Sequence, residues 1–246
     1  MKRQFLTVAL GMLVSTSAMA GGTVSGTIKY DGQVPPMKTI KMSADAKCEA
    51  KHTEPVTAEA LVLGEGNTLA NIFVRVKSGL PEGKTYETPA EPTVLNQLGC
   101  MYVPHVIAVQ KDQPVKILNS DGTLHNVHGL PTKNAEFNVA MPAFKKEISK
   151  TFDQVEDPFK VKCDVHPWMG GYIAVMDNPF FDVTAQDGKF EIKDLPAGDY
   201  EIEFWQEKLG TQVQKVTVAD GATQTLDVTM TRPETVGQLN FIVIEN

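Results

Sequence analysis

The chain has 246 residues, a formal net charge of −7 and 42% hydrophobic residues. Its lysines and arginines are not clustered, which excludes the usual pattern of nucleic-acid-binding proteins, because those proteins hold phosphates with basic patches. The GxxxxGK(S/T) motif of phosphate-binding loops is absent, and so is the Cys-x-x-Cys-His motif that attaches c-type haem. The length is sufficient for two ordinary domains.

The first twenty residues have the pattern of a secretory signal peptide. Lys2 and Arg3 precede an apolar run from Phe5 to Val14, and an Ala-x-Ala cleavage site ends at Ala20. The apolar run is shorter than the roughly 20 residues that a membrane helix needs, and no second run of that length follows. We therefore expect an exported, periplasmic protein without a membrane anchor.

The rest of the chain has the period-two hydrophobicity of β-strands. Phe159, Val161 and Cys163 alternate with polar residues, which places these three side chains on one face of a strand. Tyr200–Phe204 alternates in the same way, and the Asp-Gly pair at 187–188 is typical of a hairpin turn. No convincing amphipathic helix is present. Short strands with frequent turns predict an all-β protein built from sandwiches or barrels.

Three cysteines follow the predicted cleavage site. Export to an oxidising compartment favours one disulfide and leaves one thiol over. Cys163 stands three residues before His166 and six before Met169, so a thiol, an imidazole and a thioether form a cluster of soft metal ligands. We therefore expect a disulfide between Cys48 and Cys100, although sequence alone does not give the connectivity, and a metal-binding role for Cys163.

This cluster meets the ligand requirements of a blue copper site. Such sites place two imidazoles and a thiolate in a trigonal plane, with a weak axial thioether. A loop that leaves one strand at Cys163 and enters the next strand after Met169 can supply three of the four ligands. An earlier strand must supply the fourth, and His125 is available for that role.

Two motifs in this order resemble the cupredoxin family, in particular its plastocyanin and amicyanin group, over residues 92–177. The motifs are His125-Asn126-Val127 and the loop Cys163-x-x-His166-x-x-Met169, and each lies among β-rich runs. The short loop resembles amicyanin more than plastocyanin. The resemblance implies one copper ion held by His125, Cys163 and His166, with Met169 as a weak axial ligand. A single loop cysteine argues against a binuclear copper centre, and structural zinc sites favour several cysteines.

The resemblance also implies roles for neighbours of the ligands. Asn126 would link the two ligand strands and donate its backbone N–H to the Cys163 sulfur. The exposed edge of His166, beside Pro167 and Trp168, would be the electron port. We place Trp168 at the rim of the site for partner docking, with core packing against the loop as the alternative.

Two further histidines, His105 and His128, are not required by the family pattern. His128 is three residues from His125, so on a regular strand the two side chains face opposite ways. We interpret both as solvent-facing or hydrogen-bonded imidazoles. The alternative is a second metal contact or a proton-linked role near the copper.

The flanking segments contain no part of these motifs. Residues 180–200 resemble the second half of a carboxypeptidase regulatory-like, transthyretin-type sandwich, and residues 24–36 resemble its beginning. We therefore predict one discontinuous sandwich with a cupredoxin Greek-key β-sandwich inserted in it; independent β-modules in series are the alternative. The predicted divisions are a signal peptide (1–20), an N-terminal β segment (21–90), the cupredoxin domain (91–177) and a C-terminal β segment (178–246).

The function expected from the sequence is single-electron transfer by a mononuclear type 1 copper protein, without enzymatic turnover. The expected partners are redox proteins with a basic surface, such as a c-type cytochrome or a periplasmic dehydrogenase. Copper delivery without redox turnover is one alternative, although the chain has no methionine-rich motif. The others are a carbohydrate-binding surface module that uses Phe204 and Trp205, and a copper enzyme with a second site at His105 or His128.

Overall fold

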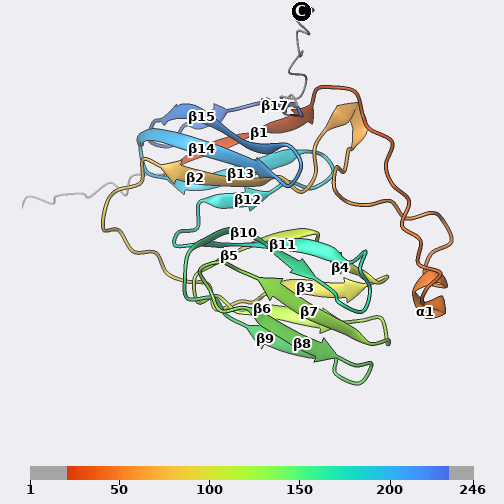
Figure 1. Cartoon of the computed structure of the whole chain (residues 1–246). Coiled ribbons are helices and arrows are strands. Elements are labelled where there is room, and N and C mark those ends of the chain that lie inside the picture. Colours follow the sequence, from red (N-terminus) through yellow and green to blue (C-terminus); the bar gives the residue numbers. More distant parts are fainter. Residues whose placement is uncertain (1–20, 233–246) are drawn as a thin grey trace, which may run out of the picture.

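The computed structural model describes residues 21–232, so the predicted signal peptide at 1–20 lies outside the described residues. The fold is all-β, as the sequence predicts, and two β-sandwiches stack on one another (Figure 1). Within the described residues, the helical elements are the unpredicted short helix α1 (Ala46–Glu49) and the 3-10 turn η1 (Glu65–Asn67). No helix in this part of the chain is long and apolar enough to cross a membrane.

The first sandwich, here called the end sandwich, is built from both ends of the described chain. One sheet has the order β13-β1-β16, with β17 also paired to β1, and the other has the order β12-β2-β14-β15. Because β1 pairs with β13, β16 and β17, the first strand of the described residues shares a sheet with three strands from their C-terminal part. The strands are β1 (Gly22–Tyr30), β2 (Phe73–Ser78), β12 (Phe181–Val183), β13 (Lys189–Leu195), β14 (Gly198–Gln206), β15 (Gly210–Val218), β16 (Thr223–Thr225) and β17 (Val228–Met230).

The second sandwich, here called the central sandwich, contains the predicted metal ligands. One sheet has the order β5-β11-β10-β7-β8 and the other the order β4-β3-β6-β9. Phe159, Val161 and Cys163 are all buried in its core, which confirms the alternation predicted for this stretch. The strands are β3 (Thr93–Leu98), β4 (Met101–Val103), β5 (Val106–Gln110), β6 (Val115–Asn119), β7 (His125–Leu130), β8 (Phe137–Met141), β9 (Glu147–Lys150), β10 (Glu156–Lys162) and β11 (Gly170–Met176).

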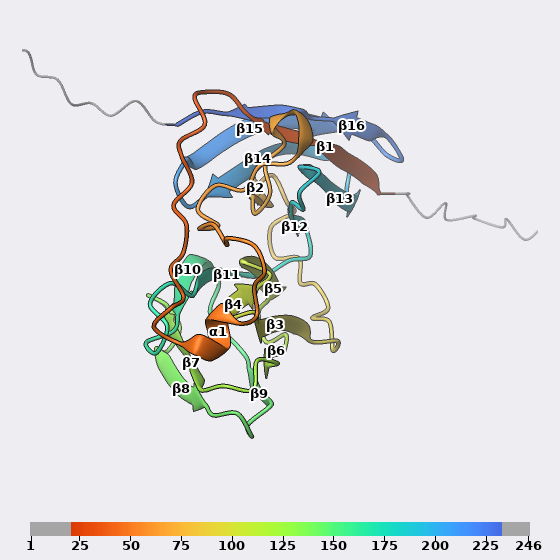
Figure 2. The same cartoon turned by 90° about the vertical axis from the view of Figure 1, so that its right-hand side faces the viewer.

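Residues 38–58, here called the strap, leave the end sandwich and lie along the central sandwich with α1 at the tip (Figure 2). A backbone hydrogen bond from the Ile40 N–H to the Val56 carbonyl (2.8 Å) joins the two arms of the strap. At the tip, Met42 and Cys48 are buried in the core of the central sandwich. The strap is therefore packed against the sandwich that carries the predicted ligands.

The two sandwiches also meet directly. Phe73 of β2 belongs to the same buried cluster as Met176 of β11. Nη2 of Arg75, on β2, lies 2.7 Å from Oδ1 of Asp157, on β10. The segment 21–90 thus contributes strands to the end sandwich and the strap to the central one, while the domain boundaries themselves stay a prediction.

Candidate metal centre

The nitrogen and sulfur ligands predicted from the sequence lie at one end of the central sandwich. β7 begins at His125, and Cys163 follows the last residue of β10. The two strands pair antiparallel, with His128 opposite Lys162, so the start of β7 lies beside the end of β10. His166 comes from the loop that joins β10 to β11. The fold thus brings residues that are far apart in the sequence to one place.

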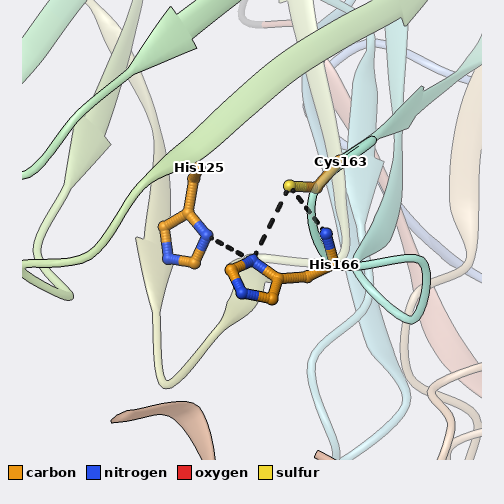
Figure 3. Close-up of side chains that lie close together, drawn as sticks. All are labelled: His125, Cys163 and His166. Carbon is orange, nitrogen blue, oxygen red and sulfur yellow. Dashed lines mark hydrogen bonds between the residues drawn. The ribbon is translucent and has the colours of Figure 1, made fainter. Parts of the chain in front are cut away.

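His125, Cys163 and His166 point toward one another (Figure 3). The two Nδ1 atoms are 2.9 Å apart, and Sγ of Cys163 lies 3.9 Å from Nδ1 of His166. One donor atom from each residue lies within 4.8 Å of the other two. All three side chains are buried, with exposed fractions of 0%, 2% and 2% in chain order. The donors therefore face a common point that is shielded from solvent.

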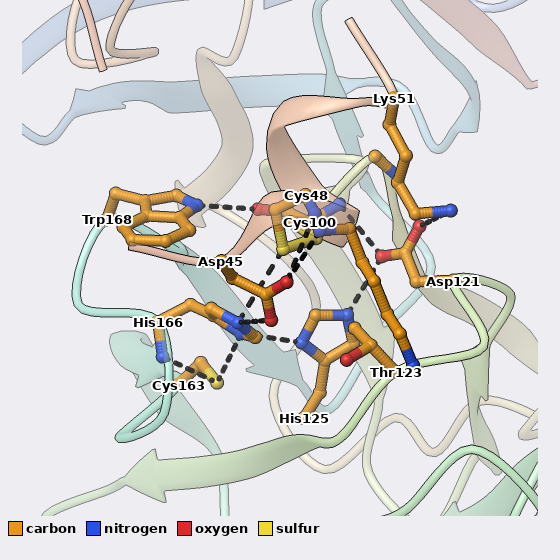
Figure 4. Close-up of a disulfide and its surroundings, with 12 residues drawn as sticks. Asp45, Cys48, Lys51, Cys100, Asp121, Thr123, His125, Cys163, His166 and Trp168 are labelled. Atoms are coloured by element: carbon orange, nitrogen blue, oxygen red, sulfur yellow. Dashed lines mark hydrogen bonds and ion pairs between the residues drawn. A yellow bond between two sulfur atoms is a disulfide. The ribbon is translucent and has the colours of Figure 1, made fainter. Parts of the chain in front are cut away.

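Both histidines turn their other ring nitrogen toward a carboxylate (Figure 4). Nε2 of His125 lies 2.9 Å from Oδ2 of Asp121, and Nε2 of His166 lies 3.0 Å from Oδ2 of Asp45. A carboxylate accepts hydrogen bonds, so each Nε2 carries a hydrogen and each Nδ1 faces the other ligands. Carboxylate partners of this kind orient ligand imidazoles and raise their basicity.

Two Nδ1 lone pairs cannot face each other at 2.9 Å unless a proton or a metal ion lies between them. Burial lowers the pKa of His125, but its hydrogen bonds to Asp121 and Cys163 outweigh burial and raise that pKa to about 9. In the metal-free protein, a proton therefore lies between the two Nδ1 atoms. A bound metal ion would replace this proton.

Asp121 joins the histidine pair to the predicted disulfide, which the structure contains between Cys48 and Cys100. The carboxylate of Asp121 accepts the backbone N–H groups of Gly99 (2.7 Å) and Cys100 (2.8 Å), and Nζ of Lys51 lies 3.1 Å away. Burial raises the pKa of Asp121, but the hydrogen bond with the neighbouring histidine and these other donors outweigh burial and lower that pKa to about 2. The carboxylate is therefore ionised beside the ligands.

Cys163 is held in a setting that favours the thiolate. Burial alone raises the pKa of this thiol, but a hydrogen bond from His125 and the backbone N–H groups of Asn126 and His166 outweigh burial and lower it. Oδ1 of Asn126 also accepts the N–H of Asp164 at 2.7 Å, so Asn126 links the two ligand strands. The thiolate is the form of cysteine that binds metals.

Met169 is buried, with 1% of its surface exposed, in the same core cluster as Cys163. The Met169 N–H donates to the His166 carbonyl (2.9 Å), and the Cys163 N–H donates to the Met169 carbonyl (3.2 Å). These backbone bonds hold the ligand loop in one shape. Axial ligation by the Met169 sulfur stays a prediction.

The expected exposure of His166 is wrong. Only 2% of this residue is exposed, because the strap covers it. Asp45 binds Nε2, and Sγ of Cys48 lies 3.6 Å from the same nitrogen. The strap belongs to the segment 21–90, which the sequence predicts in the end sandwich, tied to the central one by the Cys48–Cys100 disulfide, but no cover over His166 is expected from it. The outer edge of this ring is therefore closed to a partner protein.

Trp168 both packs on the loop and reaches the surface. Its ring lies 5.0 Å from the His166 ring, centroid to centroid, and its Nε1 donates to the Cys100 carbonyl (3.1 Å). Trp168 is partly exposed, and Pro167 beside it is exposed. Both line a cavity of about 390 Å³ between the two sandwiches. The exposed residues of the ligand loop are thus Asp164, Val165 and Pro167, with Trp168 partly exposed.

The extra histidines have carboxylate partners of their own. Nε2 of His105 lies 2.8 Å from Oε1 of Glu207, and its Nδ1 lies 3.5 Å from Oε2 of Glu59, at the junction of the sandwiches. His128 lies near the surface between two carboxylates, with Nδ1 2.9 Å from Asp164. Neither histidine belongs to the group formed by the three predicted ligands.

Sequence reasoning missed Asp45 and Asp121. A local signal exists for each: Asp45 precedes Ala46 as the N-cap of α1, and Asp121 stands four residues before His125. Neither signal shows that the carboxylate meets a ligand imidazole, because that contact depends on how the strap and the β6–β7 turn fold.

The residues present fit a copper ion. Two imidazole nitrogens and a thiolate are the donors of a trigonal copper site, and a thioether lies in the same loop. The facing Nδ1 atoms at 2.9 Å call for a positive charge between them. The buried setting also suits a site whose ligands must be kept from water.

Comparison with known proteins gives a family match and weak structural likenesses. Residues 179–231 match the carboxypeptidase regulatory-like domain. No curated protein matches the chain. A copper-containing nitrite reductase from Thermus scotoductus SA-01 is 18% identical over 41% of this chain and 26% of its own length, with a TM-score of 0.33. Two mutants of amicyanin, one in the Cu(I) form and one oxidised, are 19% and 20% identical over 42% of this chain and 97% of theirs, each with a TM-score of 0.31.

Proposed function

We propose that this chain is an exported type 1 copper protein that carries single electrons. The observation that supports this most is the pair of facing Nδ1 atoms beside a cysteine that favours the thiolate. His125, Cys163 and His166 would hold the ion, and Met169 would be the weak axial ligand. On this proposal the central sandwich is a cupredoxin of the amicyanin kind.

Bound copper would supply a one-electron couple between Cu(I) and Cu(II). The residues around it keep the ligands in one arrangement. Asp45 and Asp121 orient the two imidazoles, and the backbone N–H groups of Asn126 and His166 support the charge on the thiolate. Ligands that are fixed in this way need little rearrangement when the charge at the site changes.

We also propose a periplasmic location and protein redox partners. The location rests on the predicted signal peptide. The partners would be a c-type cytochrome or a periplasmic dehydrogenase. The net charge of −7 favours docking on a basic surface and an association that weakens as salt is added.

Titration of the mature protein with Cu(II), followed by visible and EPR spectroscopy, tests this proposal. We expect an intense thiolate-to-copper charge-transfer band that saturates at one copper per chain. Cys163→Ala should abolish the band, because the other two cysteines are joined in a disulfide. His128→Gln is the matched control and should keep it. Several weakly bound copper ions, or binding that persists without Cys163, would contradict the proposal and favour copper delivery.

A further inference from the structure

We infer that Asp45 is a positioning residue for the metal centre. The strap carries Asp45 onto His166, where its carboxylate selects which ring nitrogen faces the metal and closes the outer edge of the ring. This role for Asp45 matters only if the proposed copper site is correct. The His166 tautomer, which tests the role, can nevertheless be measured without a metal.

The two oxygens of the Asp45 carboxylate have different partners. Oδ1 accepts the backbone N–H groups of Lys47 (2.8 Å) and Cys48 (3.4 Å), which caps the first turn of α1. Oδ2 is left for Nε2 of His166 at 3.0 Å. One side chain therefore fixes the end of the strap and the imidazole together.

Contacts around Asp45 hold the tip of the strap in this place. Cys48 is bonded to Cys100, and Nζ of Lys51 lies 3.1 Å from Oδ1 of Asp121. Met42, on the other side of Asp45, is buried in the core of the central sandwich. Because anchors flank it on both sides, the Asp45 carboxylate has a defined position opposite His166 (Figure 4).

Asp45 gives His166 the same kind of hydrogen-bond partner that Asp121 gives His125. Each Nε2–H donates to a carboxylate, and each Nδ1 is directed inward. Without Asp45, Nε2 of His166 would have no oxygen acceptor among the described residues, because its other neighbour is Sγ of Cys48 at 3.6 Å, and only the His125 ring, 2.9 Å from Nδ1, would bear on the tautomer. The carboxylate thus favours the tautomer whose Nδ1 is free to bind a metal.

Asp45→Asn tests this role with little change in shape. Asparagine caps helices as well as aspartate does, so its Oδ1 can keep the bonds to α1. Its amide NH₂ would then point at Nε2 of His166 and favour the tautomer with the hydrogen on Nδ1. Long-range ¹H–¹⁵N NMR of the metal-free protein should show Nε2–H in the wild type and a shift toward Nδ1–H in the variant. The Cu(II) affinity should fall by about 10- to 100-fold.

Asp45→Ser provides a second test in case the asparagine variant folds poorly. Serine also caps helices but is too short to reach His166. We expect a mixture of tautomers and faster modification of His166 by diethyl pyrocarbonate, followed by mass spectrometry. Glu49→Gln is the matched control, because it removes the same charge from the same helix and Glu49 forms no ion pair within residues 21–232. It should change neither readout.

The outcomes separate this inference from the proposed function. A wild-type protein whose His166 carries its hydrogen on Nδ1, or a tautomer unchanged in both Asp45 variants, would overturn the role of Asp45 even if the copper band appears. A Nε2–H tautomer that is lost in both variants supports the role of Asp45, and it does so even if the protein fails to give a type 1 copper spectrum.

Discussion

Each histidine of the candidate site has one carboxylate partner for the ring nitrogen that faces away from the other donors. An imidazole without such a partner can rotate or change its tautomer, and its Nδ1 then no longer faces the metal. Asp121 reaches His125 from the turn between β6 and β7, four residues earlier in the chain, whereas Asp45 reaches His166 across 121 residues of sequence. At the residue scale, the candidate site is therefore a set of two carboxylate–imidazole pairs beside one cysteine.

Asp121→Asn should weaken metal binding without removing a donor atom. The amide cannot match the charge that supports the Nε2–H of His125, so we expect the Cu(II) affinity to fall by about 10- to 100-fold. Competition with a chelator of known Cu(II) affinity measures the Cu(II) affinity of the variant and of the wild type. Asp153→Asn, at an exposed carboxylate, is the control and should leave the affinity unchanged. Equal affinities for Asp121→Asn and the wild type would show that this carboxylate is not needed for ligation.

At the scale of elements, β10 is anchored at the end opposite Cys163. Glu156, its first residue, is 2% exposed, and its carboxylate accepts the N–H groups of Lys133 and Asn134 at 3.0 Å each and that of Thr132. Burial raises the pKa of Glu156, but the Asn134 side chain and these N–H groups outweigh burial and lower that pKa to about 2. The loop before β8 and the start of β10 are thus held together by one ionised carboxylate.

Glu156→Gln should destabilise the fold in a pH-dependent way. The folded pKa of about 2 lies below the ordinary value of 4.5, so ionised Glu156 stabilises the fold above the ordinary value. This stabilisation is lost as the pH falls through the folded value. We expect the variant to lose about 1–3 kcal/mol of unfolding free energy at neutral pH. Urea unfolding of both proteins at a series of acidic pH values should show the difference in unfolding free energy shrinking as the pH falls. A difference that stays constant would contradict the assignment.

At the scale of the whole molecule, the junction of the sandwiches places a cavity beside the ligand loop. His105 lies before β5 of the central sandwich, Glu207 lies between β14 and β15 of the end sandwich, and Glu59 directly follows the strap. Burial lowers the pKa of His105, but the hydrogen bond to Glu207 and the nearby Glu59 carboxylate outweigh burial and raise that pKa to about 9. A charged imidazole therefore joins three separate parts of the chain.

His105→Gln should weaken this junction most at neutral and lower pH. Because the folded pKa of about 9 is above the ordinary value of 6.5, protonated His105 stabilises the fold fully below the ordinary value. That stabilisation disappears as the pH rises through the folded value. Thermal unfolding should give the variant a lower Tm than the wild type, and this difference in Tm should narrow toward alkaline pH. His128→Gln, near the surface, should have little effect, since exposed ion pairs contribute little. A gap that widens toward alkaline pH would contradict the assignment.

The period-two alternation and the ligand loop could be predicted from the sequence because both are local. Apolar residues at 159, 161 and 163 lie on one face of a strand, and this depends only on their local alternation. The spacing of Cys163, His166 and Met169 is likewise a property of a single loop. The closed edge of His166 could not be predicted in this way. It depends on a helix of four residues, Ala46–Glu49, whose sequence carries no amphipathic pattern.

The sequence by itself determined the all-β class and the candidate donors, because each follows from residue type and short spacing. Only the tertiary structure decided which groups surround those donors. The strap crosses from one sandwich to the other, is bonded there through Cys48 and Cys100, and brings Asp45 to Nε2 of His166. Contacts between residues more than a hundred positions apart arise from packing and chain topology, and no local pattern specifies them.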